Sequence, residues 1–123
     1  MLVKKKYNLI ASFKFAFLGI TRAIKKERNL KIHLVMASLA IVLAVCLKIS
    51  NIEWLVLVLI IGMVISAEVF NSSLEAFCDL MRSRLNLDYY ETYWIRNFAA
   101  GAVLVLAISA VIIGFIIFLP RIF

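Results

Sequence analysis

The chain has 123 residues, of which 65% are hydrophobic and 17% charged, and it contains one proline. It is far more apolar than a soluble domain of ordinary composition, and its length leaves room for a single domain, residues 1–123. A net charge of +7 would suit nucleic acid in a soluble protein, but nine of the 14 basic residues precede position 32 and adjoin hydrophobic segments. That arrangement favours an anionic membrane surface, so we expect no nucleic-acid partner.

An amphipathic helix is predicted at about residues 8–30. Its apolar side chains recur at helical spacing, whereas the basic side chains fall elsewhere around the helix. The apolar positions are Ile10, Phe13, Phe17, Ile20 and Ile24. We expect this helix to lie in the membrane interface, with its apolar face toward the hydrocarbon.

Three membrane spans are predicted after this helix, at about residues 32–50, 54–81 and 97–119. The uncharged run of the first span, residues 34–47, is long enough to cross a membrane only if the flanking residues at both of its ends are included. The third crosses a hydrocarbon core of about 30 Å on its own at 1.5 Å per residue. Residues 82–96 form the predicted loop between the second and third spans. The expected fold class is therefore an all-α integral membrane protein with three transmembrane helices.

The basic residues predict the orientation of the chain. They are concentrated between Lys4 and Lys31 and again in the 82–96 loop. The short loop after the first span has only Lys48, which is opposed by Glu53. The positive-inside rule therefore places the amino terminus and the 82–96 loop in the cytoplasm. The expected location is the plasma membrane, crossed several times.

Four polar residues share one face of the predicted second span: Glu68, Asn71, Glu75 and Asp79. On a helix that advances about 100° per residue, all four fall within a stripe roughly 80° wide. A carboxylate at bilayer depth costs on the order of a few kcal/mol unless it is paired or wetted. The stripe therefore requires either a divalent cation with oxygen ligands or nearby basic side chains. The candidate cations are Arg28, Lys31, Arg82 and Arg96.

Spacing alone leaves more than one interpretation of the stripe open. The acids can serve chemistry at the membrane, or they can form a carboxylate–arginine network that only holds helices together. A cation path through a channel or transporter is a third alternative, but Ser109 is the only hydroxyl in residues 98–119. His33 begins the first span and is interpreted as an interfacial histidine hydrogen-bonded to backbone or lipid.

The segment at residues 67–79 resembles the E-x-x-N-[ST]-x-x-E-x-x-x-D signature of the prokaryotic diacylglycerol kinase family, which includes the undecaprenol kinases of Gram-positive bacteria. Other segments agree in order and spacing, so the resemblance covers nearly the whole chain. These segments are residues 27–29 followed by His33, residues 52–54 at the start of the second span, and residues 99–104 at the start of the third.

The resemblance implies a homotrimeric bundle of three-span subunits, each with an amino-terminal surface helix. It implies transfer of the γ-phosphoryl group of ATP to a lipid hydroxyl at the cytoplasmic interface, with Mg²⁺ as the metal. The expected acceptor is undecaprenol, because residues 27–29 with His33 look like the Gram-positive branch. Diacylglycerol is the alternative acceptor.

The resemblance also implies roles for single residues. Glu68 corresponds to the base or orienting group for the lipid hydroxyl, and Asn71 to a polar positioning group. Glu27 and Glu75 correspond to the metal-binding acids. The positions implied for nucleotide binding are Phe15, Lys31, Arg96 and Asn97.

Two departures from the family pattern concern nucleotide binding. Arg96 and Asn97 stand where the family usually has Lys-Asp, so a phosphate-binding cation is retained and an acid loses its charge. The loop from Asp79 to Asn97 is also longer than usual, and Asp88 or Glu91 within it is a candidate for replacing the acid. An alternative is therefore a catalytically weakened kinase-like membrane protein with an assembly or lipid-binding role.

Overall fold

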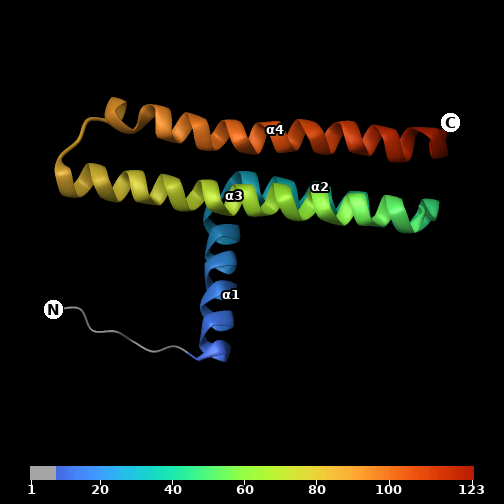
Figure 1. Ribbon diagram of the computed structural model, residues 1–123, viewed down its shortest axis with the longest axis horizontal. Helices are drawn as coiled ribbons and strands as arrows, with labels where there is room; N and C mark the ends of the chain where they lie inside the picture. The colour runs from blue at the N-terminus through green and yellow to red at the C-terminus, as the bar shows by residue number, and fades with distance from the viewer. Residues whose placement is uncertain (1–7) are drawn as a thin grey trace.

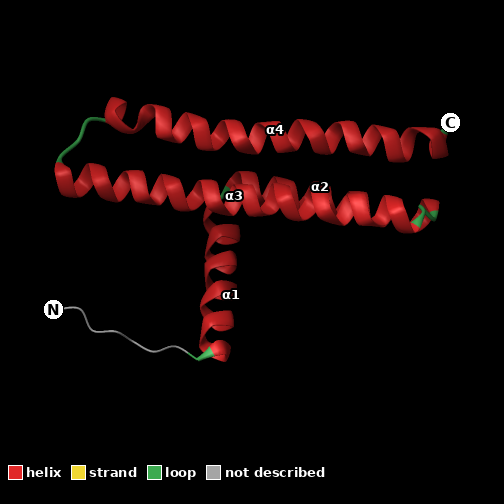
Figure 2. Cartoon of the chain, in the orientation of Figure 1, coloured by secondary structure: helices red, strands yellow, loops and turns green. Residues whose placement is uncertain are grey.

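The computed structural model describes residues 8–123, which form four α-helices joined by short turns, with no strand among them (Figures 1 and 2). The helices are α1 (Leu9–Lys26), α2 (Arg28–Leu47), α3 (Asn51–Leu85) and α4 (Tyr89–Ile122). Helices α2, α3 and α4 pack along one another, and α1 projects away from them (Figure 1). The basic residues at positions 4–6 that contribute to the predicted orientation lie outside the described residues.

Helices α2, α3 and α4 are each long and apolar enough to cross a membrane. This confirms the prediction of an all-α fold with three spans and a shorter amino-terminal helix. Most of the large apolar side chains on these helices are exposed in the single chain. A membrane supplies the apolar surroundings that such surfaces require.

Glu27 separates α1 from α2, so the amino-terminal helix ends at Lys26 and not near residue 30 as predicted. The backbone of Glu27 is extended, with φ −98° and ψ 115°. Its N–H still donates to the carbonyl of Ala23 (2.8 Å), and its own carbonyl accepts from the N–H of Lys31 (3.3 Å). Hydrogen bonding therefore continues through the corner while the chain changes direction.

Ser50 fixes the start of α3 through a capping box with Glu53. The Ser50 side chain accepts from the Glu53 N–H (3.2 Å), and the Glu53 carboxylate accepts from the Ser50 N–H (3.0 Å). Glu53 also forms an ion pair with Arg121 in the last turn of α4. The Glu53 carboxylate therefore accepts from a backbone N–H at the start of α3 and also links this end of α3 to the last turn of α4.

The predicted loop at residues 82–96 is wrong, because both helices continue into it. Helix α3 ends at Leu85, α4 begins at Tyr89, and only residues 86–88 form a turn (Figure 2). Asn86 ends α3 in a left-handed conformation (φ 53°), and the Leu87 N–H donates to the Arg82 carbonyl (3.1 Å). Charged side chains mark the edge of the predicted spans, but they do not end an α-helix.

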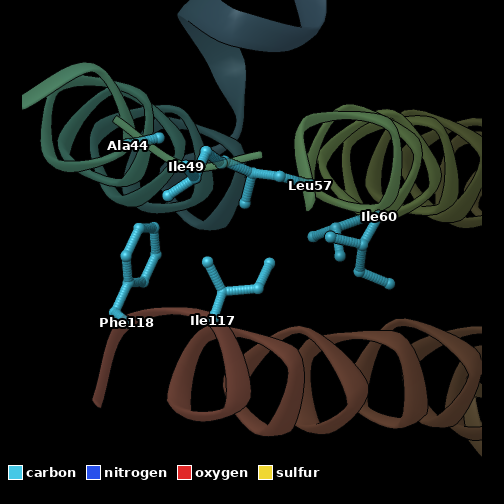
Figure 3. Packing of buried hydrophobic residues seen from close by; sticks show 7 residues of the cluster. Ala44, Ile49, Leu57, Ile60, Ile117 and Phe118 are labelled. Carbon is cyan, nitrogen blue, oxygen red and sulfur yellow. The ribbon is translucent and has the colours of Figure 1, made fainter. Parts of the chain in front are cut away.

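The buried apolar cluster lies at the end of the bundle away from the 86–88 turn. Side chains from α2, the following turn, α3 and α4 point toward one another there (Figure 3). The members are Ala44, Ile49, Leu57, Ile60, Val64, Ile117 and Phe118. At the opposite end, the parts of α3 and α4 that flank the turn extend past α1 (Figure 1).

Candidate functional site

Glu68 is an almost completely buried carboxylate, with 2% of its surface exposed. Its Oε2 atom lies 3.6 Å from Nε2 of His33 on α2, a contact that is longer than a hydrogen bond. Glu27 and Glu75 lie within electrostatic range of the same carboxylate. We call Glu27, Glu68, Asn71 and Glu75 the acidic site, which the α1–α2 corner and α3 bring together.

Asn71 lies one helical turn after Glu68 and is also buried. Its Nδ2 donates to Oε1 of Glu75 (3.3 Å), whereas its Oδ1 is buried without a hydrogen-bond partner among the described residues. An unsatisfied buried acceptor costs about 1–3 kcal/mol. The Asn71 carbonyl oxygen is therefore available to a donor or a cation that enters the site.

Asp79 occupies different surroundings from the other three members of the predicted stripe. Its side chain is 62% exposed, and its Oδ1 lies 2.6 Å from Nη2 of Arg96 on α4. Arg96 also donates from Nε to the hydroxyl of the buried Thr92 (3.2 Å), and its side chain is only 15% exposed. The stripe therefore divides into the acidic site, in which Glu68 and Asn71 are buried and Glu75 is partly buried, and an exposed carboxylate that is paired with arginine.

The other predicted site residues are not buried with the acidic site in a single chain. Lys31 is exposed in the first turn of α2, and Asn97 is exposed on α4. Phe15 is half-exposed on α1, roughly 18 Å along the helix axis from Glu27 at 1.5 Å per residue. Asp88 and Glu91, the candidates for replacing the lost acid, are both exposed where α4 begins.

The contact between His33 and Glu68 was missed in the sequence analysis, which assigned His33 a backbone or lipid partner. The helical register of α2 directs His33 toward α3, and a titratable side chain within an apolar span is the signal that could have suggested a buried acid as its partner. Two further residues were missed near Asp79. They are Tyr89 and Thr92, the second of which holds Arg96.

The acidic site offers only part of a metal site within one chain. Among residues 8–123, no group of three or more histidine, cysteine, aspartate or glutamate side chains is arranged to hold a metal ion. The Glu27 and Glu75 carboxylates both lie within electrostatic range of Glu68, and Glu75 contacts Asn71, whose amide oxygen is unsatisfied. Carboxylate and amide oxygens suit Mg²⁺ when phosphate oxygens and water complete the shell. The residues present therefore fit a magnesium ion that binds together with a phosphate.

An apolar groove of about 570 Å³ lies between α2, α3 and α4. Its walls include Leu43, Val64 and Phe115, and His33 is the titratable side chain among the described residues that line it. The contact between His33 and Glu68 places the buried carboxylate next to one end of this groove. The arrangement brings a surface for hydrocarbon next to a potential proton acceptor.

Comparison with known proteins agrees with this combination of membrane helices and acidic site. The profile of the prokaryotic diacylglycerol kinase family matches residues 14–118. Undecaprenol kinase of Bacillus subtilis (strain 168) is 34% identical over 110 residues, which are 89% of this chain and 87% of that protein. Diacylglycerol kinase of Synechocystis sp. is 37% identical over 114 residues, which are 92% of this chain and 63% of that protein.

No solved structure matches the chain at a significant level. The two relatives are both lipid kinases by name, and the family profile extends from α1 to the last turns of α4. These matches confirm the resemblance found in the 67–79 segment. The chain is a multi-pass membrane protein and belongs to the prokaryotic diacylglycerol kinase family of lipid kinases.

Proposed function

We propose that this protein transfers the γ-phosphoryl group of ATP to the hydroxyl of a membrane lipid alcohol, with Mg²⁺ as the metal. The observation that carries the proposal is the buried Glu68 carboxylate, held beside His33 next to an apolar groove. Phosphoryl transfer depends mainly on alignment and on charge stabilisation, together with one group that receives the hydroxyl proton. Glu68 is positioned to be that group.

The chain's own residues divide the work of the reaction. Glu68 accepts the proton as the lipid hydroxyl attacks, and His33 orients the Glu68 carboxylate from α2. Glu27, Glu75 and the carbonyl oxygen of Asn71 would hold Mg²⁺. When bound there, the ion would neutralise charge on the phosphate oxygens.

Nucleotide binding is assigned to Phe15, Lys31, Arg96 and Asn97, which stay predictions from the family pattern. Arg96 has the best geometric support among them. Its guanidinium group is held by Asp79 and Thr92, and its remaining N–H groups, which have no hydrogen-bond partner among residues 8–123, can contact phosphate oxygens.

We propose that the chain works as a homotrimer in the plasma membrane, with its amino terminus and active site on the cytoplasmic side. The exposed apolar surfaces of α2, α3 and α4 leave ample area for helix packing between subunits. Small residues at positions 99–102 of α4 permit close helix approach. The basic residues that flank α1 and the 86–88 turn support the orientation.

Undecaprenol is the proposed acceptor, and diacylglycerol is the alternative. The Bacillus relative, an undecaprenol kinase, is covered over more of its length than the Synechocystis diacylglycerol kinase. The groove is lined almost entirely by apolar side chains, which suits the hydrocarbon chain of a lipid alcohol.

A direct assay separates the two acceptors. Purified protein in neutral detergent micelles receives labelled ATP, Mg²⁺ and one lipid at a time, and the labelled lipid is extracted and counted. We expect kcat/KM for undecaprenol to exceed that for diacylglycerol by at least about 10-fold, with no product when EDTA removes Mg²⁺. Faster diacylglycerol phosphorylation would reverse the acceptor assignment. Phosphorylation of neither lipid would support a kinase-like protein without catalysis.

His33 provides a test of how Glu68 is held. Replacing it with leucine is expected to lower kcat about 10-fold, equivalent to about 1.4 kcal/mol, with little change in KM for ATP, because Glu68 loses the side chain that orients it. His33→Gln should recover part of the loss. Ser38→Ala is the matched control on α2, since that hydroxyl only donates to the Leu34 carbonyl. Equal rates for His33→Leu and Ser38→Ala would contradict the assigned role.

A further inference from the structure

Two guanidinium groups lie against the ring of Tyr89, the first residue of α4. The Cζ atoms of Arg82 on α3 and of Arg96 on α4 are each 5.2 Å from the ring centroid. Both distances are within the range of a cation–π interaction. The ring therefore holds two like charges near each other, and repulsion between them is relieved when an anion binds.

A third cation approaches the same place from α1. Arg82, Arg96 and Lys26 all lie within electrostatic range of the Asp79 carboxylate, and they come from three different helices. We call Lys26, Arg82 and Arg96 the basic cluster. Asp79 neutralises one of these charges because it is paired with Arg96. The Asp79 side chain is exposed, so the cluster is accessible to water.

Arg82 differs from Arg96 in how well its donors are satisfied. Arg96 donates to Asp79 and Thr92, whereas Nε of Arg82 is buried and has no hydrogen-bond partner among the described residues. A buried donor on a charged group is costly to leave unpaired. The missing partner is an acceptor, and next to three cations an anionic oxygen is the acceptor that best fits.

The basic cluster lies beside the acidic site and further toward the 86–88 turn. Asp79 follows Glu75 by one helical turn, about 6 Å along the axis of α3. A polyphosphate chain is long enough to span that separation. A phosphate held by the cluster can therefore belong to the same molecule as a phosphate placed at Glu75.

We infer that Arg82 and Lys26 join Arg96 in binding phosphate oxygens of the nucleoside triphosphate, and that Tyr89 is a positioning residue that holds the two guanidinium groups in place. The inference rests on the proposed function, because it assigns these residues to the phosphoryl donor. It adds two cations and one aromatic ring that were not among the predicted nucleotide-binding residues.

The test measures nucleotide binding without turnover. A nonhydrolysable ATP analogue is titrated calorimetrically into the full-length protein in neutral detergent micelles with Mg²⁺, and KM for ATP is measured in parallel. We expect Arg82→Gln to raise Kd for the analogue and KM for ATP about 10-fold and to change kcat less than 2-fold. Arg84→Gln removes the same charge from an exposed neighbouring position and should change both values less than 2-fold.

Further variants separate the roles of charge and ring. Arg82→Lys keeps the charge but lacks the Nε donor, so it should fall between Arg82→Gln and the unmodified protein. Tyr89→Phe should bind normally, whereas Tyr89→Leu should weaken analogue binding as Arg82→Gln does. Lys26→Gln should weaken binding more than Lys25→Gln. Each variant is used only if its thermal unfolding in detergent is cooperative, and Arg82→Lys tests the inference if Arg82→Gln fails that criterion.

The outcomes show whether the bound phosphate belongs to a nucleotide or to a lipid, and whether the inference or the proposed function is the one that fails. If Arg82→Gln binds the analogue as tightly as Arg84→Gln does, the inference is wrong. If Arg82→Gln instead loses only the binding of phosphatidylglycerol added to the micelles, the cluster binds a lipid phosphate, which also overturns the nucleotide assignment. Arg82-dependent analogue binding by a protein that phosphorylates no lipid would support the inference and reject the proposed function.

Discussion

Glu68→Gln is expected to lower the rate of lipid phosphorylation by about 10³-fold, with little change in KM for ATP. Glutamine has nearly the same shape as glutamate but cannot accept a proton, and a positioned general base contributes about 10²- to 10⁴-fold. Initial rates with labelled ATP and undecaprenol in micelles provide the measurement. Glu53→Gln is the matched control, because it is the same change on the same helix at the end away from the site.

The same substitution should leave the protein as stable as before, or make it more stable. Glu68 is 2% exposed and lies near two other acids, so a neutral amide removes both like-charge repulsion and the cost of burying a carboxylate, and these gains offset the lost contact with His33. Loss of activity with an unchanged or higher unfolding temperature in detergent is the pattern of a catalytic group. If Glu68→Gln unfolds or dissociates the protein, the carboxylate instead serves a helix-packing network, which was the alternative interpretation of the stripe.

Glu75→Gln is expected to raise the Mg²⁺ concentration needed for half-maximal activity by about 10- to 100-fold. The affinity of an oxygen site for a divalent cation depends on the number of charged ligands, and Glu75 is one of the two acids assigned to the metal. The variant keeps an amide oxygen and can still accept from Nδ2 of Asn71. Titration of activity with Mg²⁺ at fixed ATP provides the measurement.

Glu53→Gln again serves as the control and should follow the Mg²⁺ titration of the unmodified protein. High Mg²⁺ should restore much of the activity of Glu75→Gln but none of that lost in Glu68→Gln. This difference separates a metal ligand from a proton acceptor. A Glu75→Gln variant that loses activity with an unchanged Mg²⁺ titration would show that Glu75 does not bind the metal.

The sequence was sufficient for the features that depend on local spacing. The 100° rotation per residue placed Glu68, Asn71 and Glu75 on one face of α3, and hydrophobic length identified the three spans. The family signature lies within a single helix, so it could be read without knowing the tertiary structure. These predictions required no information about which helices touch.

Features that depend on contacts between helices could not be predicted in this way. Nothing in the residues around Glu27 requires a corner, since neither glycine nor proline is present there, although the backbone of Glu27 is extended. That corner and the register of α2 decide that His33 meets Glu68. Arg82 and Tyr89 approach each other only after the 86–88 turn folds α4 back along α3.

In the proposed arrangement, the corner at Glu27 sets the depth at which the reaction takes place. Helix α1 is amphipathic and projects from the bundle (Figure 1), so its expected place in the membrane interface puts the boundary between hydrocarbon and water at the level where it meets α2. The apolar groove lies on the hydrocarbon side of that level, and the basic cluster lies beside the part of the α3–α4 hairpin that extends past it. The chain of a lipid alcohol can therefore stay in hydrocarbon while a nucleotide stays in water. Only the lipid hydroxyl and the γ-phosphate have to meet at the boundary.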